Sequence, residues 1–463
     1  MDCQKGRVES DMQKEEKKSF LFTSIELRKL IIPLIFEQTL AITVGMADTM
    51  MISSVGEAAV SGVSLVDMLN VLMFNILSAL ATGGAVITSQ NLGAKKVKEA
   101  CRSARQLLIS SLALSVILAV LVVLFRNGLL RLFFGSIEQD VMEAALIYLI
   151  ISAVSFPFLG IYNSCAALFR AMGKANITFI VSVIGNIINV VGNAFCIFVL
   201  HMGVTGVAIP SLISRAVMGI ILYVLLKNPS YEIHLDKEKF QLDMNIIKKI
   251  LYIGIPSGIE SGIFQLGRVL VVSIISGFGT IQIAANGVAN SLDSMGCIIG
   301  QAMNLAMITV IGRCVGAGDQ DQIRYYTRKL MVITYISTAI INSVILLNLN
   351  PILALYGLGA ETTELAYILV MIHNGVAIIL WPLSFVFPNM LRACNDVRQP
   401  MVISIVSMVV FRIGFSYIIG VHMGLGAIGV WIAMVIDWTV RSICFAFRYI
   451  HGDWKTLMYK LSK

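Results

Sequence analysis

The chain has 463 residues and a mean hydropathy of +0.84, with 57% hydrophobic and only 13% charged residues. A soluble domain carries about 25% charged residues, so this composition excludes a large soluble domain and indicates a protein that crosses a membrane many times. The net charge of +8 does not indicate nucleic-acid binding, because the basic residues collect in particular loops, as membrane topology requires. The first 19 residues are polar, so no cleavable signal peptide is expected.

Apolar segments long enough to cross a membrane recur from one end of the chain to the other. A helical span needs about 20 residues, and the apolar pattern does not alternate as a strand would. We therefore expect an all-α polytopic membrane protein with twelve transmembrane helices. The predicted spans cover residues 25–53, 58–90, 103–125, 140–169, 176–200, 204–226, 246–276, 280–312, 325–349, 362–391, 399–421 and 426–449.

The first span contains two carboxylates, Glu37 and Asp48. Eleven residues at about 100° each bring their side chains to within about 20° of one helix face, three turns apart. A carboxylate in the middle of a membrane costs several kcal/mol, so it is expected to face a cavity, a partner or an ion. We expect Asp48 to belong to a cation site that drives transport. The alternative is that it only caps irregular helix backbone.

Lys and Arg are concentrated in alternate loops and in both terminal segments, which predicts that both termini are cytoplasmic. The basic set includes Lys95, Lys96, Lys98, Arg170, Lys174, Lys227, Lys248, Lys249, Arg324, Arg328, Arg392 and Arg398. The alternate set offers only Arg126 and Arg131, beside several carboxylates. An even number of spans agrees with this orientation. We expect a multi-pass monomer in the plasma membrane of a prokaryote.

A polar stretch near the middle of the chain divides six spans from six. The expected organisation is a cytoplasmic N-terminal tail (1–24), an N-lobe (25–227), a cytoplasmic linker (228–245), a C-lobe (246–450) and a cytoplasmic C-terminal tail (451–463).

The two halves carry the same landmarks at a constant spacing. Glu37 and Glu260 are 223 residues apart, and the same offset joins Pro33 to Pro256, Gly56 to Gly279, and Gly93 to Gly316. Residues 169–173 resemble residues 391–395 at an offset of 222. Six spans per half give both halves the same orientation, so we expect parallel, pseudo-symmetric repeats about an axis along the membrane normal, with binding sites near the midplane.

The ordered set of motifs resembles the multidrug and toxic compound extrusion (MATE) family, within the larger group of multidrug and lipid-linked oligosaccharide exporters. The resemblance runs from about residue 25 to about residue 450. It rests on the sequences GMADTMMI at 45–52, FRAMGKAN at 169–176 and GVTGVAI at 203–209, together with Asn186, Asn189 and Asn193. It implies two six-helix lobes that form a V, alternating access, and efflux coupled to Na⁺ or H⁺.

The resemblance also implies a cation site in the N-lobe. Asn189 and Asn193 share a face of the fifth span, and family members place an Asn and an Asp at these positions. With Asp48 from the first span and Ser211 from the sixth, they would form the coupling site. Asn193 replaces the second carboxylate, which leaves one formal charge fewer. A structural role, in which these side chains only bridge helices, is the alternative.

Other polar residues within the predicted spans can be interpreted as functional or as structural. Glu37, Gln38 and Glu260 are predicted to contact substrate or to gate the lobes, and a structural role is the alternative. Arg412 and Asp437 are predicted to form a structural ion pair between the last two spans, because a lone charge at that depth is too costly.

We interpret the sequence as a secondary active multidrug efflux transporter that exchanges amphipathic, often cationic, organic compounds for Na⁺ or H⁺. We expect no enzymatic activity, no cofactor and no metal site beyond Na⁺ at Asp48. The expected partners are small-molecule substrates and membrane lipid, not nucleic acid. The main alternative is a flippase for lipid-linked oligosaccharides or polysaccharides, which would need a strongly cationic central cavity. The membrane arginines look few and scattered in the sequence, which favours the multidrug reading.

Overall fold

The structure is a computed structural model that describes residues 20–135, 138–235 and 241–459. It contains twelve helical spans, as the sequence predicts. The N-lobe spans are α2 (Ser24–Ser53), α3 (Glu57–Gly93), α4 (Val97–Leu124), α6 (Gln139–Ala171), α7 (Ala175–Ala194) with the π-helical η1 (Phe195–Val199), and α8 (Thr205–Leu226). Residues 1–19 of the predicted N-terminal tail lie outside the residues that the structure describes.

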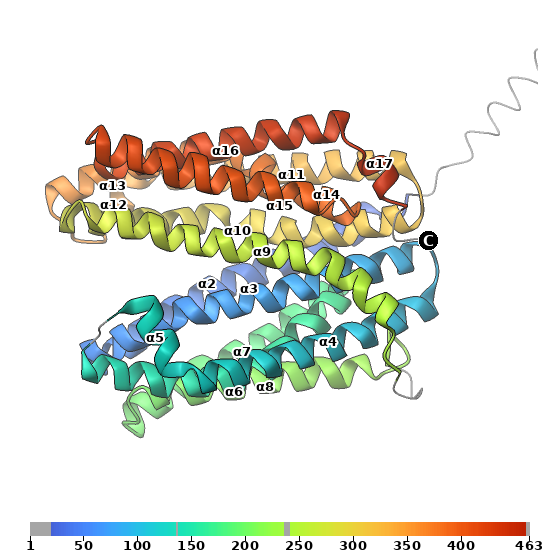
Figure 1. Cartoon of the computed structure of the whole chain (residues 1–463), viewed down its shortest axis with the longest axis horizontal. Helices are drawn as coiled ribbons and strands as arrows, with labels where there is room; N and C mark the ends of the chain where they lie inside the picture. The colour runs from blue at the N-terminus through green and yellow to red at the C-terminus, as the bar shows by residue number, and fades with distance from the viewer. Residues whose placement is uncertain (1–19, 136–137, 236–240, 460–463) are drawn as a thin grey trace, which may run out of the picture.

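The C-lobe repeats this order in the second half of the chain. Its spans are α9 (Met244–Ser276), α10 (Thr280–Gly316), α11 (Gln320–Leu347), α13 (Ala360–Trp381) with η2 (Pro382–Val386) and α14 (Pro388–Ala393), α15 (Arg398–Val406) with η3 (Ser407–Gly414) and η4 (Ser416–His422), and α16 (Gly426–His451). Short helices α5 (Arg126–Phe134) and α12 (Leu349–Ala354) follow the third span of each lobe, and α17 (Trp454–Leu457) ends the described chain. Figure 1 shows the two lobes stacked one above the other.

Helix starts coincide with local signals in the sequence. Thr23 and Glu26 form a capping box at the start of α2, and Asp243 caps α9 through the backbone N–H groups of residues 245 and 246. Gly56 and Gly279, which are repeat equivalents, precede α3 and α10 with φ angles of 138° and 99°. Only glycine adopts such angles without strain, so the repeated landmark marks the same sharp entry into the second span of each lobe.

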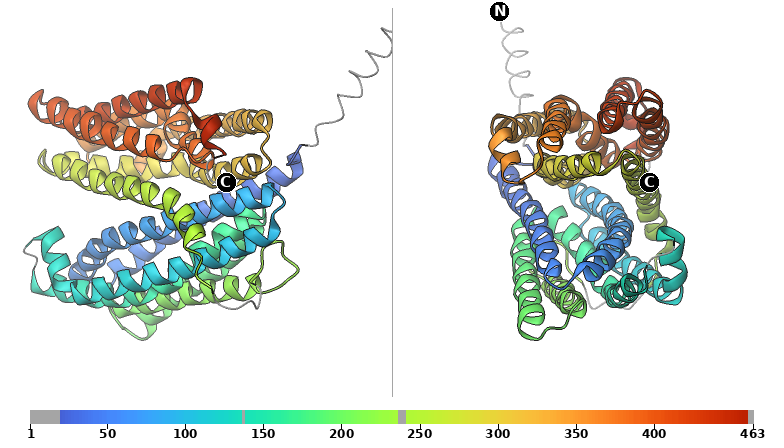
Figure 2. Two further views of the ribbon diagram at one scale, coloured as in Figure 1. Left: turned by 45° about the vertical axis from the view of Figure 1, so that its right-hand side comes forward. Right: turned by 90° about the vertical axis from the view of Figure 1, so that its left-hand side faces the viewer.

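The lobes converge at the end of the molecule that carries the described termini and diverge at the other end (Figure 2). At the convergent end, Leu27, Leu30 and Leu34 of α2 belong to the hydrophobic core of the C-lobe. The ends of α3 and α10 touch there backbone to backbone: a Cβ added at Gly93 would lie 2.0 Å from the Arg313 carbonyl oxygen, and one at Gly316 would lie 1.8 Å from that of Gln90. The repeated glycines therefore permit closure of this end.

Segments predicted as tails and linker also pack onto the lobes. Phe22 is buried and its backbone N–H donates to the Tyr326 hydroxyl of α11 over 2.9 Å. In the linker, Ile233 is buried and Glu232 pairs with Arg313 at 3.2 Å. Trp454 of α17 is buried and stacks on Tyr449. These contacts anchor the chain segments outside the spans at the convergent end.

Candidate functional site

The residues predicted for the cation site meet in one cavity inside the N-lobe. The cavity has a volume of about 240 Å³ and is lined by α2, α3, α6, α7 and α8. Asp48, Asn189 and Ser211 line it, and Asn193 Nδ2 donates to Asp48 Oδ1 over 2.8 Å. The predicted residues thus come together from three helices that are far apart in the sequence.

One amide oxygen beside Asp48 has no hydrogen-bond partner in the described residues and is available to a cation. In the orientation that satisfies both ends of its amide, the Asn189 nitrogen donates to Asp48 Oδ1 over 2.9 Å, and its oxygen accepts from the Ser211 hydroxyl. Asn193 Oδ1 is buried and has no hydrogen-bond partner among the described residues. Carboxylate, amide and hydroxyl oxygens suit a hard cation such as Na⁺, so this donor set fits the coupling ion.

A second carboxylate, Asp67 of α3, lies in the same cavity, and our sequence analysis missed it. Its Oδ1 accepts hydrogen bonds from the Tyr148 hydroxyl over 3.1 Å and from Asn70 Nδ2 over 3.2 Å. Arg215 of α8 also lines the cavity and donates to the Ser155 hydroxyl. The cavity therefore carries two carboxylates, Asp48 and Asp67, and one guanidinium group, Arg215.

Glu37 and Glu260 form equivalent ion pairs in the two lobes. Arg170 Nη1 lies 3.4 Å from Glu37 Oε1, and Arg392 Nη2 lies 2.6 Å from Glu260 Oε2. Each arginine comes from the end of the fourth span of its own lobe. Gln38, beside Glu37, is half-buried. Both glutamates are buried and paired, so both make a structural contact. Glu260 in addition borders a cavity.

That cavity lies between the lobes and has a volume of about 400 Å³. The N-lobe contributes the middle of α3, and the C-lobe contributes α9, α10, η2, α14 and α16. Its lining residues carry one carboxylate, Glu260, and three guanidinium groups, Arg268, Arg392 and Arg441. The interpretation of the membrane arginines as scattered is therefore wrong: the fold brings three of them to one wall, from helices up to 173 residues apart.

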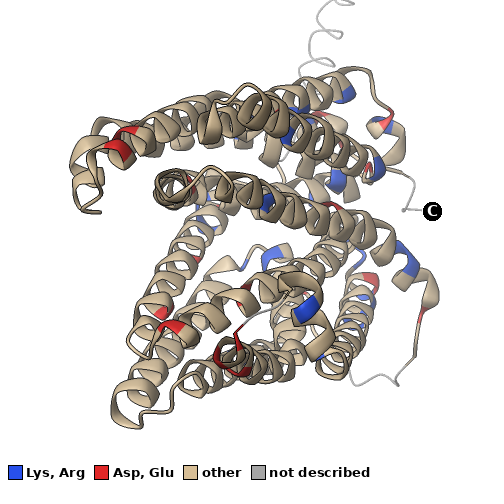
Figure 3. Cartoon of the chain, turned by 60° about the vertical axis from the view of Figure 1, so that its left-hand side comes forward, with Lys and Arg blue, Asp and Glu red and all other residues tan. Residues whose placement is uncertain are grey.

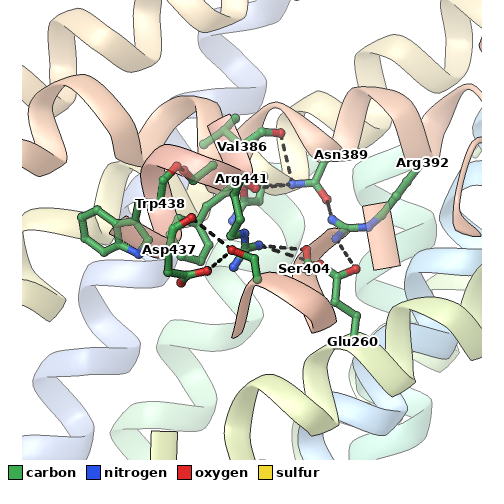
Figure 4. Close-up of polar contacts among 12 residues, drawn as sticks. Glu260, Val386, Asn389, Arg392, Ser404, Asp437, Trp438 and Arg441 are labelled. Carbon is green, nitrogen blue, oxygen red and sulfur yellow. Dashed lines mark hydrogen bonds and ion pairs between the residues drawn. The ribbon is translucent and has the colours of Figure 1, made fainter. Parts of the chain in front are cut away.

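The break in the fourth span of the C-lobe positions this wall. The π-helical η2 begins at Pro382, and Pro388 follows it at the start of α14. Each proline lacks an N–H and so disturbs the regular hydrogen-bond ladder of the helix. Asn389 Nδ2 donates to the carbonyl oxygens of Phe385 and Val386 and to Asn304 Oδ1. Asn389 Oδ1 in turn accepts from Arg392 Nη1 over 2.6 Å, which fixes the arginine against Glu260 (Figure 4).

Arg412 and Asp437 lie deeper in the C-lobe. Arg412 Nη1 is 4.0 Å from Asp437 Oδ2, the outer limit of an ion pair. Asp437 also accepts a hydrogen bond from Ser407 (Figure 4). These contacts fit the structural role that we predicted for the pair.

A further polar cluster in the C-lobe joins α10 to α13. His373 Nε2 lies 2.7 Å from Asp293 Oδ1, and the Cys297 thiol donates to the same oxygen over 3.2 Å. Asn374 and Asn342 continue the network behind the imidazole. Ligand atoms of Asp293, Cys297 and His373 lie within 4.8 Å of one another, so they could hold a metal ion, although the dispersed histidines gave no such expectation. In the structure, the Asp293 carboxylate oxygen lies directly against the imidazole nitrogen and the thiol.

Comparison with known proteins places the whole architecture in one family. The MatE family model matches residues 33–195 and again residues 256–418, two segments of equal length with the offset of 223 seen in the landmarks. The chain belongs to the MatE family. Members of this family are transporters rather than enzymes. The first match contains Asp48, Asn189 and Asn193, and the second contains Glu260, whereas Ser211 and Arg441 lie beyond the matched segments.

Full-length MatE relatives share the sequence along nearly the whole chain. An uncharacterized transporter of Bacillus subtilis (strain 168), YisQ, is 26% identical over 441 residues and is covered over 95% of its length, with 93% of this chain. The "probable multidrug resistance protein NorM" of Thermotoga maritima is 24% identical over 445 residues, with 93% of each chain covered. This MatE protein is therefore a multi-pass membrane transporter. Several of its relatives are named as probable multidrug resistance proteins.

Solved MATE structures share the fold. The outward-facing conformation of a multidrug resistance MATE transporter superposes with a TM-score of 0.85 at 21% identity, covering 94% of this chain and 96% of that one. A transporter of the larger MOP superfamily from Pyrococcus furiosus superposes with a TM-score of 0.86 at 20% identity, covering 95% and 96%. The binding pocket of that protein is described as having reverse polarity, suggesting a different function.

Proposed function

We propose that this MatE protein is a secondary active exporter of small amphipathic organic molecules, driven by Na⁺ or H⁺ moving the opposite way. The observation that carries the proposal is the N-lobe cavity, where Asp48 is surrounded by oxygen and amide ligands separate from the cavity between the lobes. One cavity can therefore hold the driving ion while the other holds the substrate.

Helix α2 physically links binding of the driving ion in the N-lobe to movement of the two lobes. Asp48 lies near one end of α2, and Leu27, Leu30 and Leu34 near the other end pack into the C-lobe core. A cation at Asp48 replaces the amide hydrogen bonds that join α2 to α7. The resulting change in the course of α2 reaches the contact between the lobes. Rocking of the lobes then closes one side of the central cavity and opens the other.

The charge distribution supports an orientation with the convergent end in the cytoplasm. Lys and Arg gather towards this end, where the C-terminus lies (Figure 3), and basic residues favour the cytoplasmic side. The cavity in this conformation then opens outward, and the bacterial relatives favour a plasma membrane. One positive charge moving through about 100 mV supplies about 2.3 kcal/mol, enough for a substrate gradient of about 50-fold.

A flippase for lipid-linked oligosaccharides is the second candidate. It is favoured by one observation, the three arginines of the central cavity, because such a lipid carries phosphate groups that Arg binds well. The relatives named for multidrug resistance support the exporter instead.

Transport in proteoliposomes tests the proposal. Wild type and Asp48→Asn are given rhodamine 123 or fluorescein under an imposed Na⁺ gradient or an imposed pH gradient alone, with Glu57→Gln, an exposed carboxylate of α3, as the matched control. We expect wild type and Glu57→Gln to accumulate dye on one of the two gradients and Asp48→Asn on neither. Undiminished accumulation by Asp48→Asn would contradict the role of Asp48. Movement of a lipid-linked saccharide, but of neither dye, would favour the flippase.

A further inference from the structure

The wall of the central cavity that belongs to the C-lobe has more positive than negative charge. Glu260 is shared between two arginines, with Oε2 at 2.6 Å from Arg392 and Oε1 at 3.9 Å from Arg441. Arg268 is exposed and lines the same cavity. Among the residues that line this cavity, one carboxylate thus faces three guanidinium groups. Asp437 and Asp293, which are electrostatic partners of Arg441 and Arg268, are not among the lining residues.

Arg441 has donors that no protein group uses. Its side chain is only 3% exposed. Nη2 donates to the Ser404 hydroxyl over 3.0 Å (Figure 4), whereas Nε and Nη1 have no hydrogen-bond partner in the described part of the chain. A buried N–H group without a partner is expensive. The guanidinium lines the cavity, so an acceptor that enters from the cavity would satisfy it.

The groups beside Arg441 are aromatic. Its guanidinium carbon lies 4.6 Å from the ring centre of Phe385 and 5.7 Å from that of Phe264, and both rings line the cavity. Aromatic faces provide apolar contact and hold the arginine in place. The wall therefore combines a cationic hydrogen-bonding centre with an apolar surface for the body of a ligand.

We infer that this wall binds the anionic oxygen group, a carboxylate or a phosphate, of an amphipathic substrate, with Arg441, Arg392 and Arg268 as its contacts. The inference rests on the proposed export function and names its substrate class. It departs from the preference for cationic compounds that the sequence indicates. The acidic cavity for the driving cation lies in the N-lobe, and the basic wall for the substrate lies in the C-lobe, so the two charges do not compete for one site.

The test is direct binding to the full-length protein in detergent, without any ion gradient. Fluorescein and rhodamine 123 share a xanthene ring system but carry opposite charge, so fluorescence polarisation compares charge at nearly constant shape. We expect fluorescein to bind at least tenfold more tightly than rhodamine 123. Arg441→Gln should weaken fluorescein binding about 10- to 100-fold, because a charge-assisted hydrogen bond is lost, and Arg441→Lys should restore part of it.

Two further variants keep the test decisive if Arg441→Gln does not fold. Arg268→Gln changes an exposed side chain of the cavity and should weaken fluorescein binding several-fold. Arg328→Gln, an exposed arginine of α11 away from the cavity, should have no effect. Equal or tighter binding of rhodamine 123, or fluorescein binding that neither cavity substitution changes, would overturn the inference.

Competitors separate the two sources of the anionic group. Decanoate offers a carboxylate and dioctanoyl phosphatidate offers a lipid phosphate. Displacement of fluorescein by either supports the inference and identifies the group, and displacement by neither at saturating concentration contradicts it. Loss of transport in proteoliposomes with the binding preference intact would refute the proposed function and not the site.

Discussion

At the scale of single residues, the proposed cation site of the N-lobe contains two carboxylates. Asp48 is held by two asparagine amides, and Asp67 is held by Tyr148 and Asn70 in the same cavity. One carboxylate binds a cation less tightly than two, because each contributes Coulomb attraction in a partly buried site. In the proposed cation site, Asp67 would therefore supply a second carboxylate beside Asp48.

Asp67→Asn should weaken the binding of the driving ion rather than abolish transport. We expect the concentration of Na⁺ or H⁺ that gives half-maximal dye transport to rise about tenfold, equivalent to about 1.4 kcal/mol, with the maximal rate much less affected. The measurement is the ion dependence of initial transport rates in proteoliposomes, with Glu57→Gln as the control. An unchanged ion dependence would show that Asp67 does not contribute to the site.

The Asp293–His373 pair should stabilise the C-lobe. His373 is fully buried, and loss of one partner from a buried pair costs about 3–5 kcal/mol. We expect Asp293→Leu and His373→Phe each to lower the thermal unfolding temperature in detergent, and the double variant to lower it by less than the sum. Strictly additive effects would mean that the two side chains do not act as a pair.

The sequence could predict some of these residues and not others. Asp48, Asn189, Asn193 and Ser211 were predicted to lie together, and the structure places them in contact. Asp67 carried the same signal as Asp48, a carboxylate within an apolar run, and the same cost argument would have found it. The grouping of Arg268, Arg392 and Arg441 had no local signal, because it arises from the packing of three helices.

At the scale of helices, the repeated glycines proved informative because each pair has a steric cause. The twelve spans and the two halves were correctly predicted from length, periodicity and the 223-residue offset. The π-helical segments η1, η3 and η4 were not predicted, since no proline marks them. Pro382 and Pro388 are a visible sequence signal for the break at η2, but the polar network around Asn389 depends on tertiary contacts.

Larger side chains at Gly93 or Gly316 should open the convergent end. A Cβ at either position would collide with a backbone carbonyl of the other lobe, so Gly93→Leu and Gly316→Leu cannot keep the helices in contact. Nitroxides at Lys98→Cys and Arg324→Cys, in a background without the native cysteines, report the separation by pulsed electron spin resonance. We expect a longer distance in both glycine variants.

Gly287→Leu is the matched control, because it lies on the same helix as Gly316 and has no atom within 4 Å of an added Cβ. It should keep the wild-type distance. If Gly93→Leu and Gly316→Leu also kept that distance, the glycine contact would not be what closes this end.

At the scale of the whole molecule, two similar lobes carry different charges. The N-lobe cavity has Asp48 and Asp67 against Arg215, whereas the cavity wall of the C-lobe has three arginines against Glu260. The repeat explains the common framework, including the paired Glu37–Arg170 and Glu260–Arg392 contacts. This difference in charge is the basis of the proposed division, in which the N-lobe cavity binds the driving ion and the C-lobe wall binds the substrate.

The exchange of ion for substrate is the central claim, and ion movement measures it most directly. Proteoliposomes loaded with ²²Na⁺ or with a pH-sensitive dye are exposed to external substrate without an imposed ion gradient. We predict that substrate entry drives Na⁺ or H⁺ out through wild type and Arg328→Gln, and that Asp48→Asn shows no such exchange. Substrate entry through wild type without any ion movement, or equal exchange by Asp48→Asn, would contradict coupling at Asp48.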